Sequence, residues 1–173
     1  MNLQTQAEAV SAGLSIPGAF DAKLWAAIQG YNLNIVTKTF AERHPKYGAD
    51  AAYLERETKR FLYLAAAMPD TELAPTRPID EYWHQMILFT DLYQDFGQEF
   101  VGEYIEHNPL AGPDHAKIFE DTQRHVRTHF GEEFEGIEFW TLPMPATSCR
   151  CTSPSKRRAR NVPYFFSRDR NVN

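Results

Sequence analysis

The chain has 173 residues, of which 43% are hydrophobic, and a formal net charge of −5; this length suits one domain with its own core and a tail. No run approaches the roughly 18 apolar residues of a membrane-spanning helix, which argues against a membrane protein of that class. The N-terminus has neither a basic start nor a continuous apolar run, so we expect no secretory signal and a cytoplasmic protein.

Charge is divided unevenly along the chain. Residues 1–148 carry 11 basic and 22 acidic side chains, a net charge of −11, whereas residues 149–173 carry seven and one, a net charge of +6. The acidic body would repel nucleic acid, so contact with nucleic acid is expected only through the basic tail, at Lys156, Arg157, Arg158 and Arg160.

Cys149 and Cys151 begin this tail. A C-x-C pair alone cannot complete a tetrahedral zinc site, which favours a pair of reduced, exposed thiols.

The first two helices are predicted from apolar spacing. One runs from Phe20 to His44, with Asp21 as its N-cap and Pro45 ending it. Its apolar stripe recurs every three or four residues and comprises Leu24, Trp25, Ile28, Tyr31, Ile35, Val36 and Phe40. The next runs from about Asp50 to Met68, with an apolar face and a charged face formed by Glu55, Arg56, Lys59 and Arg60.

Two further helices complete an all-α fold, a compact bundle of about four helices with short loops. The third is predicted from Pro78 to about Phe96, with Gly97 as its C-terminal breaker. The fourth begins after Asp114 and ends before Gly131; its apolar face carries Ile118, Phe119, Thr122, Val126 and Phe130. His125 and His129 are four residues apart and could bind a metal with a nearby carboxylate, but the neighbouring Arg124 and Arg127 favour a solvated face.

Three segments are expected outside these helices. Residues 1–19 are polar and small, which indicates a flexible arm before a helical domain at residues 20–142. Residues 136–142 are aromatic and roughly alternating, and since a lone strand would lack a partner, we expect an extended segment packed on the helices. Residues 143–173 are rich in Pro, Ser and Arg, a composition typical of a disordered tail.

The candidate site is formed by Asp80, His84 and His107. Asp80 and His84 are four residues apart on the third helix, so their side chains share a face. The carboxylate can fix the tautomer of the imidazole, the pair can bind a divalent metal with His107 as a third ligand, or the two can act as an acid and a base. A purely structural role competes with all three, because a carboxylate in the first turn also complements the helix dipole. Catalytic residues are therefore left unassigned.

Several neighbours of this site are read as structural. Trp83, Tyr93 and Phe96 are predicted core residues, with the tyrosine hydroxyl finding a partner. Thr90 is expected to hydrogen-bond to a carbonyl one turn earlier. His107 is followed by Asn108 and Pro109 and can anchor a turn.

The run Asp80-x-x-Trp83-His84, then Thr90-x-x-Tyr93, Gly97 and His107-x-Pro109, resembles the glycine-rich domain-containing protein-like family. The resemblance extends from about Ala22 to Trp140 and implies a helical fold and a site at these residues, without an established activity. The chain departs from that family's pattern at Met86, where a second histidine is common, and in having His107 alone where others have two.

Three functions follow as hypotheses. The first is a non-enzymatic interaction or accessory module, with a protein partner and a structural Asp80/His84/His107 cluster. The alternative is a metal-binding protein or metal-dependent enzyme in which these three residues are ligands and leave an open coordination position. A second alternative is nucleic-acid contact through the basic tail.

Overall fold

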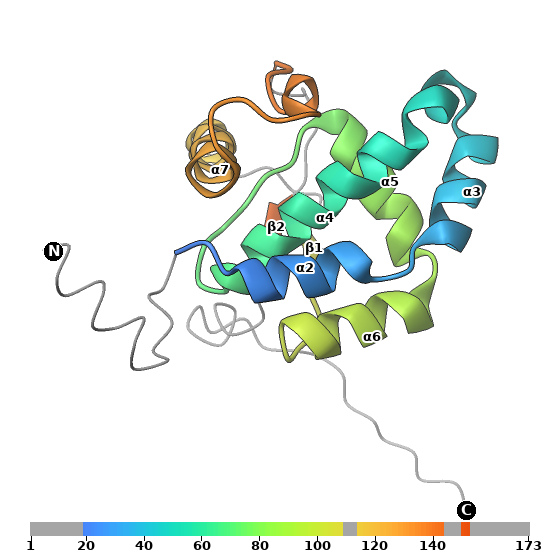
Figure 1. The fold of residues 1–173 in the computed structure, drawn as a ribbon, viewed down its shortest axis with the longest axis horizontal. Coiled ribbons are helices and arrows are strands. Elements are labelled where there is room, and N and C mark those ends of the chain that lie inside the picture. Colours follow the sequence, from blue (N-terminus) through green and yellow to red (C-terminus); the bar gives the residue numbers. More distant parts are fainter. Residues whose placement is uncertain (1–18, 109–113, 144–149, 153–173) are drawn as a thin grey trace, which may run out of the picture.

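The computed structural model describes residues 19–108, 114–143 and 150–152 (Figure 1). Within these ranges it contains six α-helices, two short 3-10 helices and two paired strands. Residues 1–18 of the predicted arm, Pro109, Cys149 and the four tail cations lie outside the described residues. In chain order the elements are α2 (Ala22–Gly30), α3 (Asn34–Arg43), η1 (Pro45–Asp50), α4 (Ala51–Ala67), α5 (Arg77–Ile87), α6 (Thr90–Phe100), β1 (Glu106–Asn108), α7 (His115–Phe130), η2 (Ile137–Phe139) and β2 (Arg150–Thr152).

The all-α prediction is confirmed, but about four helices is an undercount. The predicted first helix is two helices, α2 and α3, because the chain turns at Tyr31–Leu33 and the side chain of Asn32 accepts a hydrogen bond from the Asn34 N–H at 3.0 Å. This turn rotates the apolar face, so that Ile35 is 54% exposed whereas Leu33 is buried. The predicted third helix is likewise divided into α5 and α6, at Leu88 and Phe89.

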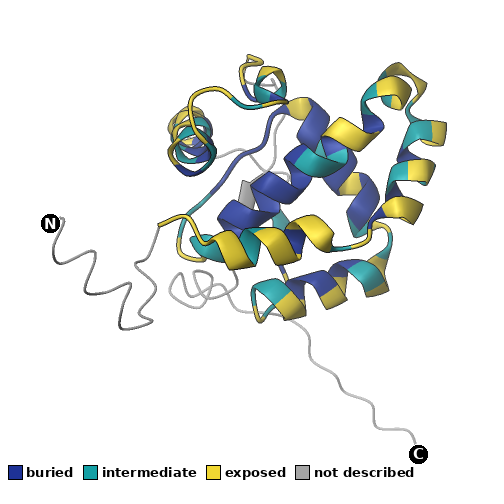
Figure 2. Cartoon of the chain, viewed as in Figure 1, coloured by how far each residue is buried: buried dark blue, intermediate teal, exposed yellow. Residues whose placement is uncertain are grey.

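Helix α4 forms the centre of the fold and contacts α2, α3, α5, η1 and α7. Every residue from Glu57 to Ala65 is buried, and the helix is accordingly dark blue over much of its length in Figure 2. The prediction of a charged outer face was wrong at Lys59 and Arg60, which are only 5% and 9% exposed. A helical segment covered on all sides, as residues 57–65 are, must bury some of its charged residues, and these then need partners inside the protein.

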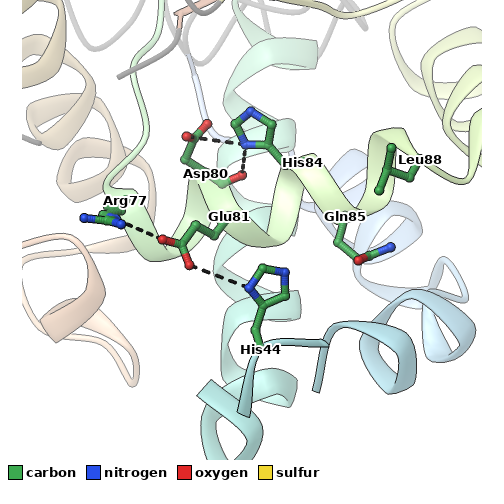
Figure 3. Close-up of a pocket in the computed structure, with 7 residues that line it drawn as sticks. All are labelled: His44, Arg77, Asp80, Glu81, His84, Gln85 and Leu88. Carbon is green, nitrogen blue, oxygen red and sulfur yellow. Dashed lines mark hydrogen bonds and ion pairs between the residues drawn. The ribbon is translucent and has the colours of Figure 1, made fainter. Parts of the chain in front are cut away.

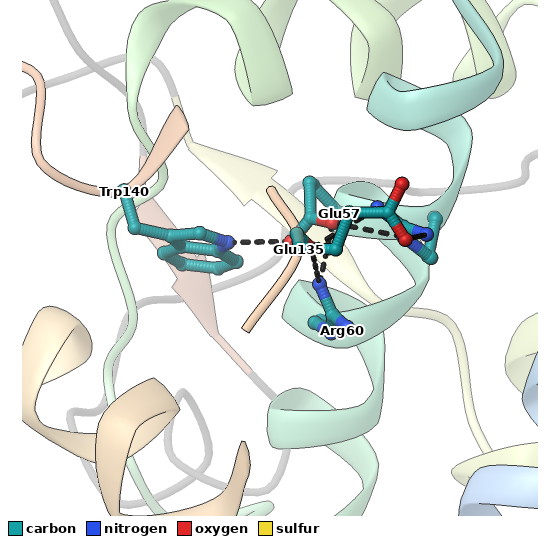
Figure 4. Close-up of polar contacts among 5 residues, drawn as sticks. Glu57, Arg60, Glu135 and Trp140 are labelled. Carbon is teal, nitrogen blue, oxygen red and sulfur yellow. Dashed lines mark hydrogen bonds and ion pairs between the residues drawn. The ribbon is translucent and has the colours of Figure 1, made fainter. Parts of the chain in front are cut away.

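The partner of Arg60 is Glu57, whose side chain is fully buried (Figure 4). One Glu57 oxygen accepts from Arg60 Nη1 at 2.5 Å, and the other accepts from the Trp140 indole N–H at 2.8 Å. Arg60 also donates to the backbone carbonyl of Glu135 at 2.9 Å. These bonds tie the segment after α7 to the central helix. The extended conformation predicted for residues 136–142 was therefore wrong at η2, a 3-10 turn that delivers the buried Trp140 to Glu57.

Gly97 lies inside α6 rather than at its end. A Cβ atom at this position would lie 2.7 Å from the carbonyl oxygen of Glu103, because the chain after α6 folds back across the helix. The helix ends instead near Gly102, whose N–H bonds to the Gly97 carbonyl and whose φ of +81° is in the left-handed region.

Replacing Gly97 with alanine is expected to lower the free energy of unfolding by about 1–3 kcal/mol, the usual range for an overpacked site. Alanine ordinarily stabilises a helix by roughly 1 kcal/mol relative to glycine, so the sign of the effect tests the close approach. Gly30→Ala is the matched control, because a Cβ there meets nothing within 4 Å. Urea unfolding of both variants measures the difference, and a stabilised Gly97→Ala protein would contradict the packing described here.

Strands β1 and β2 pair in an antiparallel ladder, with Glu106 opposite Thr152, His107 opposite Cys151 and Asn108 opposite Arg150. Residues 150–152 of the predicted disordered tail are thus paired with the helical domain. Over the described ranges, no helix is both long and apolar enough to span a lipid bilayer.

Candidate metal centre

Asp80, His84 and His107 come together in the structure. Asp80 lies in the first turn of α5 and His84 one turn later, with 3.4 Å between His84 Nδ1 and Asp80 Oδ2. His107 arrives from β1, and its Nε2 lies 3.3 Å from Asp80 Oδ1. Each of the three offers one ligand atom, and these atoms all lie within 4.8 Å of one another. Spacing along the sequence predicts that Asp80 and His84 lie close together, whereas the position of His107 beside them depends on the tertiary fold.

Helix α5 is held in place at its start. The Thr76 hydroxyl donates to the carbonyl of Phe139 at 2.6 Å, and Pro78 stands in the first turn, where its missing N–H is no loss. Asp80 donates its backbone N–H to the Thr76 carbonyl at 2.9 Å. Its side chain, only 14% exposed, is directed to the two imidazoles.

His107 is held by a buried relay through Tyr93. The Trp83 indole N–H donates to the Tyr93 hydroxyl at 3.0 Å, and that hydroxyl donates to the carbonyl of Ile105 at 2.8 Å. The Trp83 ring also lies against His107, with 4.6 Å between the ring centroids. Two core aromatic residues, from α5 and α6, thus position the segment that carries His107. The sequence contains no signal for this hydrogen-bond relay except that a buried tyrosine hydroxyl needs a partner.

Hydrogen bonding sets the tautomer of His84. Its Nδ1 lies 2.7 Å from the backbone carbonyl oxygen of Asp80, and since a carbonyl only accepts, Nδ1 carries the hydrogen. In the neutral ring Nε2 then keeps its lone pair. A ligating histidine commonly donates its other N–H to a carbonyl in this way. The His84 side chain is 51% exposed, whereas His107 is 11% exposed, so solvent reaches the cluster from the His84 side.

A cavity of about 360 Å³ opens beside Asp80 and His84 (Figure 3). Its other lining residues are His44, Arg77, Glu81, Gln85 and Leu88. Glu81 binds Arg77 at 2.8 Å and Lys46 at 3.0 Å. Burial raises the pKa of Glu81, but hydrogen bonds from Arg77 and Lys46 outweigh it and hold that pKa below its usual range. Glu81 is therefore an anion already neutralised by two cations, and it stands apart from the Asp80 cluster. Sequence reasoning did not identify it, although the Arg77–Glu81 spacing of four residues was a usable signal.

Two other residues singled out in the sequence, Thr90 and His129, differ from their predicted roles or surroundings. Thr90 is exposed and is the first residue of α6, rather than part of one continuous third helix. Its hydrogen bond to a carbonyl one turn earlier stays a prediction. His129 is 8% exposed, with its Nδ1 directed to the carbonyl of His125, and the solvated face predicted for it was wrong. Over the described residues, Asp80, His84 and His107 form the one group of three or more His, Cys, Asp or Glu residues with metal-binding proximity.

Comparison with known proteins identifies a family for this chain. A family model described as UCP032817-like matches residues 25–131, more than half of the chain. This is a different family from the glycine-rich domain-containing one, so the resemblance drawn from the Asp-x-x-Trp-His run was wrong. No curated protein and no solved structure matches the chain.

Proposed function

The chain belongs to the UCP032817-like family, and we propose that it binds one divalent transition-metal ion through Asp80, His84 and His107. The observation that carries this proposal is the convergence of one carboxylate and two imidazoles, from α5 and β1, to within 4.8 Å. Bonds of about 2.0–2.2 Å to zinc place neighbouring ligand atoms roughly 3–3.5 Å apart. The 3.3 Å between His107 Nε2 and Asp80 Oδ1 already lies in that range. His84 would bind through Nε2, which keeps its lone pair when Nδ1 donates to the Asp80 carbonyl.

The donor set suits zinc, iron or manganese, because imidazole nitrogen and carboxylate oxygen are ligands that these ions share. Three protein ligands leave coordination positions open to water or to a small molecule. The cavity beside Asp80 and His84 supplies room for such a molecule. The water or small molecule would approach from the side of His84, which is half-exposed.

Metal binding should be measured on the full chain after removal of metal by a chelator, by titration with Zn²⁺, Fe²⁺ or Mn²⁺ and by elemental analysis. We expect one equivalent per chain. His107→Ala and Asp80→Asn should weaken affinity by roughly 100-fold or more, since changes to second-shell partners alone weaken metal binding 10- to 100-fold. His125→Ala, a histidine outside the cluster, should bind as the parent does. Equal affinity in parent and His107→Ala would overturn the proposal.

A second candidate function is a non-enzymatic interaction module in which the same cluster is structural. Asp80 contacts both imidazoles directly, and so joins α5 to β1 without any ion. This function predicts a metal-free parent protein together with a clear loss of stability in His107→Ala. The partner would be another protein, and nucleic-acid contact through Lys156, Arg157, Arg158 and Arg160 stays a prediction for residues outside the described ranges.

A further inference from the structure

Gln85 is a buried polar residue that lines the cavity beside the candidate metal centre. It follows His84 directly in α5 and is only 3% exposed. No hydrogen bond joins its side-chain amide to the other residues around the cavity (Figure 3), nor to any residue elsewhere in the described ranges of the chain. A buried amide without a partner destabilises a folded protein, because its bonds to water have been lost. Polar groups placed in this way in a cavity fix the orientation of a bound molecule.

The charges around the cavity favour a ligand that is an anion. On one wall Glu81 binds Arg77 at 2.8 Å and Lys46 at 3.0 Å, so these three side chains leave one positive charge in excess. At the metal centre, Asp80 would neutralise only one of the two charges of a divalent ion. Both parts therefore attract negative charge, and the attraction is stronger in a partly enclosed cavity than in bulk water.

Next to Gln85 the cavity offers an apolar surface. Leu88, the residue at the end of α5, lines the cavity and is 66% exposed. Residues three and four positions apart are neighbours on a helix surface, so Leu88 lies beside both Gln85 and His84. The cavity volume of about 360 Å³ is at the lower end of the range for ligand pockets, which indicates a small molecule.

We propose that the cavity binds a small aliphatic carboxylate and that Gln85 selects it; this inference rests on the metal site proposed above. One carboxylate oxygen would replace a water bound to the metal, and the other would accept a hydrogen bond from the Gln85 amide N–H. The alkyl chain would pack on Leu88. A carboxylate suits this arrangement because its single charge and two oxygens match one metal ion and one amide donor.

The full chain loaded with Co²⁺ tests this assignment, with butanoate as the probe. Visible ligand-field bands of Co²⁺ change when a ligand replaces a bound water, so they report binding at the metal itself. We expect butanoate to change these bands to a saturating level and to bind roughly threefold more tightly than acetate, because it buries more apolar surface. Butan-1-ol, which has the same alkyl chain without the charge, should leave the bands unchanged.

Gln85→Leu separates ligand binding from stability. Leucine has a similar volume and no amide, so the affinity for butanoate should fall by about tenfold or more, whereas the affinity for Co²⁺ should not change. The melting temperature of the ligand-free protein should rise by about 2–4 °C, because a buried polar group without a partner is removed. A lower melting temperature would instead give Gln85 a structural role and overturn the proposal. Gln94→Leu, at an exposed position of α6, is the matched control and should change neither affinity.

The possible failures are distinguishable. Absence of all cobalt bands in the parent would overturn the metal site together with its ligand. Cobalt bands that butanoate does not change would overturn the carboxylate and leave the three-residue metal site standing. Tighter binding of inorganic phosphate than of butanoate would overturn the ligand class. Equal affinity for butanoate in the parent and in Gln85→Leu would overturn the role of Gln85.

Discussion

Glu57→Ala is expected to lower the free energy of unfolding by about 3–5 kcal/mol, the range for removing one partner of a buried ion pair. Glu57 is fully buried, and it accepts from Arg60 at 2.5 Å and from the Trp140 indole at 2.8 Å. Alanine would leave the Arg60 guanidinium in the interior without its carboxylate and the indole N–H without its acceptor. Urea unfolding followed by far-ultraviolet circular dichroism measures the loss.

Two comparisons make this result specific to the network. Glu42→Ala removes an exposed carboxylate from α3 and should change stability by no more than about 0.5 kcal/mol. A double variant, Glu57→Ala with Arg60→Ala, should be less destabilised than the sum of the two single variants, because neither charge is then left alone. Glu57→Ala with the stability of the parent would mean that Trp140 and Arg60 are held by other contacts.

Tyr93→Phe is expected to lower the free energy of unfolding by about 2–4 kcal/mol, although it removes a single oxygen atom. The Tyr93 hydroxyl accepts from Trp83 and donates to Ile105 in a buried position. Phenylalanine would leave both the Trp83 indole N–H and the Ile105 carbonyl without the hydroxyl to which they bond. Each buried polar group left without a hydrogen bond costs about 1–3 kcal/mol. Phenylalanine keeps the aromatic ring, so loss of packing does not contribute to the difference in stability.

The same substitution links the fold to the proposed metal site. Ile105 lies two residues before His107, so loosening its carbonyl should also loosen that ligand. We expect metal affinity to fall by roughly tenfold, as for other groups that orient ligands. Tyr53→Phe is the control, because Tyr53 is 42% exposed on α4; it should change neither stability nor affinity. Unchanged affinity in a destabilised Tyr93→Phe protein would show that His107 is positioned independently of this relay.

The sequence predicted those features that depend on neighbours along the chain. Asp21 caps α2 as expected, accepting from the N–H groups of Lys23 and Leu24, because a cap involves only residues two and three positions away. The proximity of Asp80 and His84 follows in the same way from the helical repeat. Apolar spacing likewise predicted an all-α protein, and the core positions Ile118, Phe119 and Val126 of α7.

The tertiary structure alone decided which polar residues are inside and which distant segments meet. Glu57 and Arg60 have ordinary helical charge spacing, and nothing local shows that other elements cover both sides of α4. The meeting of His107 with Asp80, 27 residues earlier, depends on the chain folding back after α6, which the close packing of Gly97 against Glu103 permits. The pairing of Cys151 with His107 depends on a register across separate parts of the chain. Composition and spacing carry local propensity, whereas contacts between remote segments are selected by the packing of the whole fold.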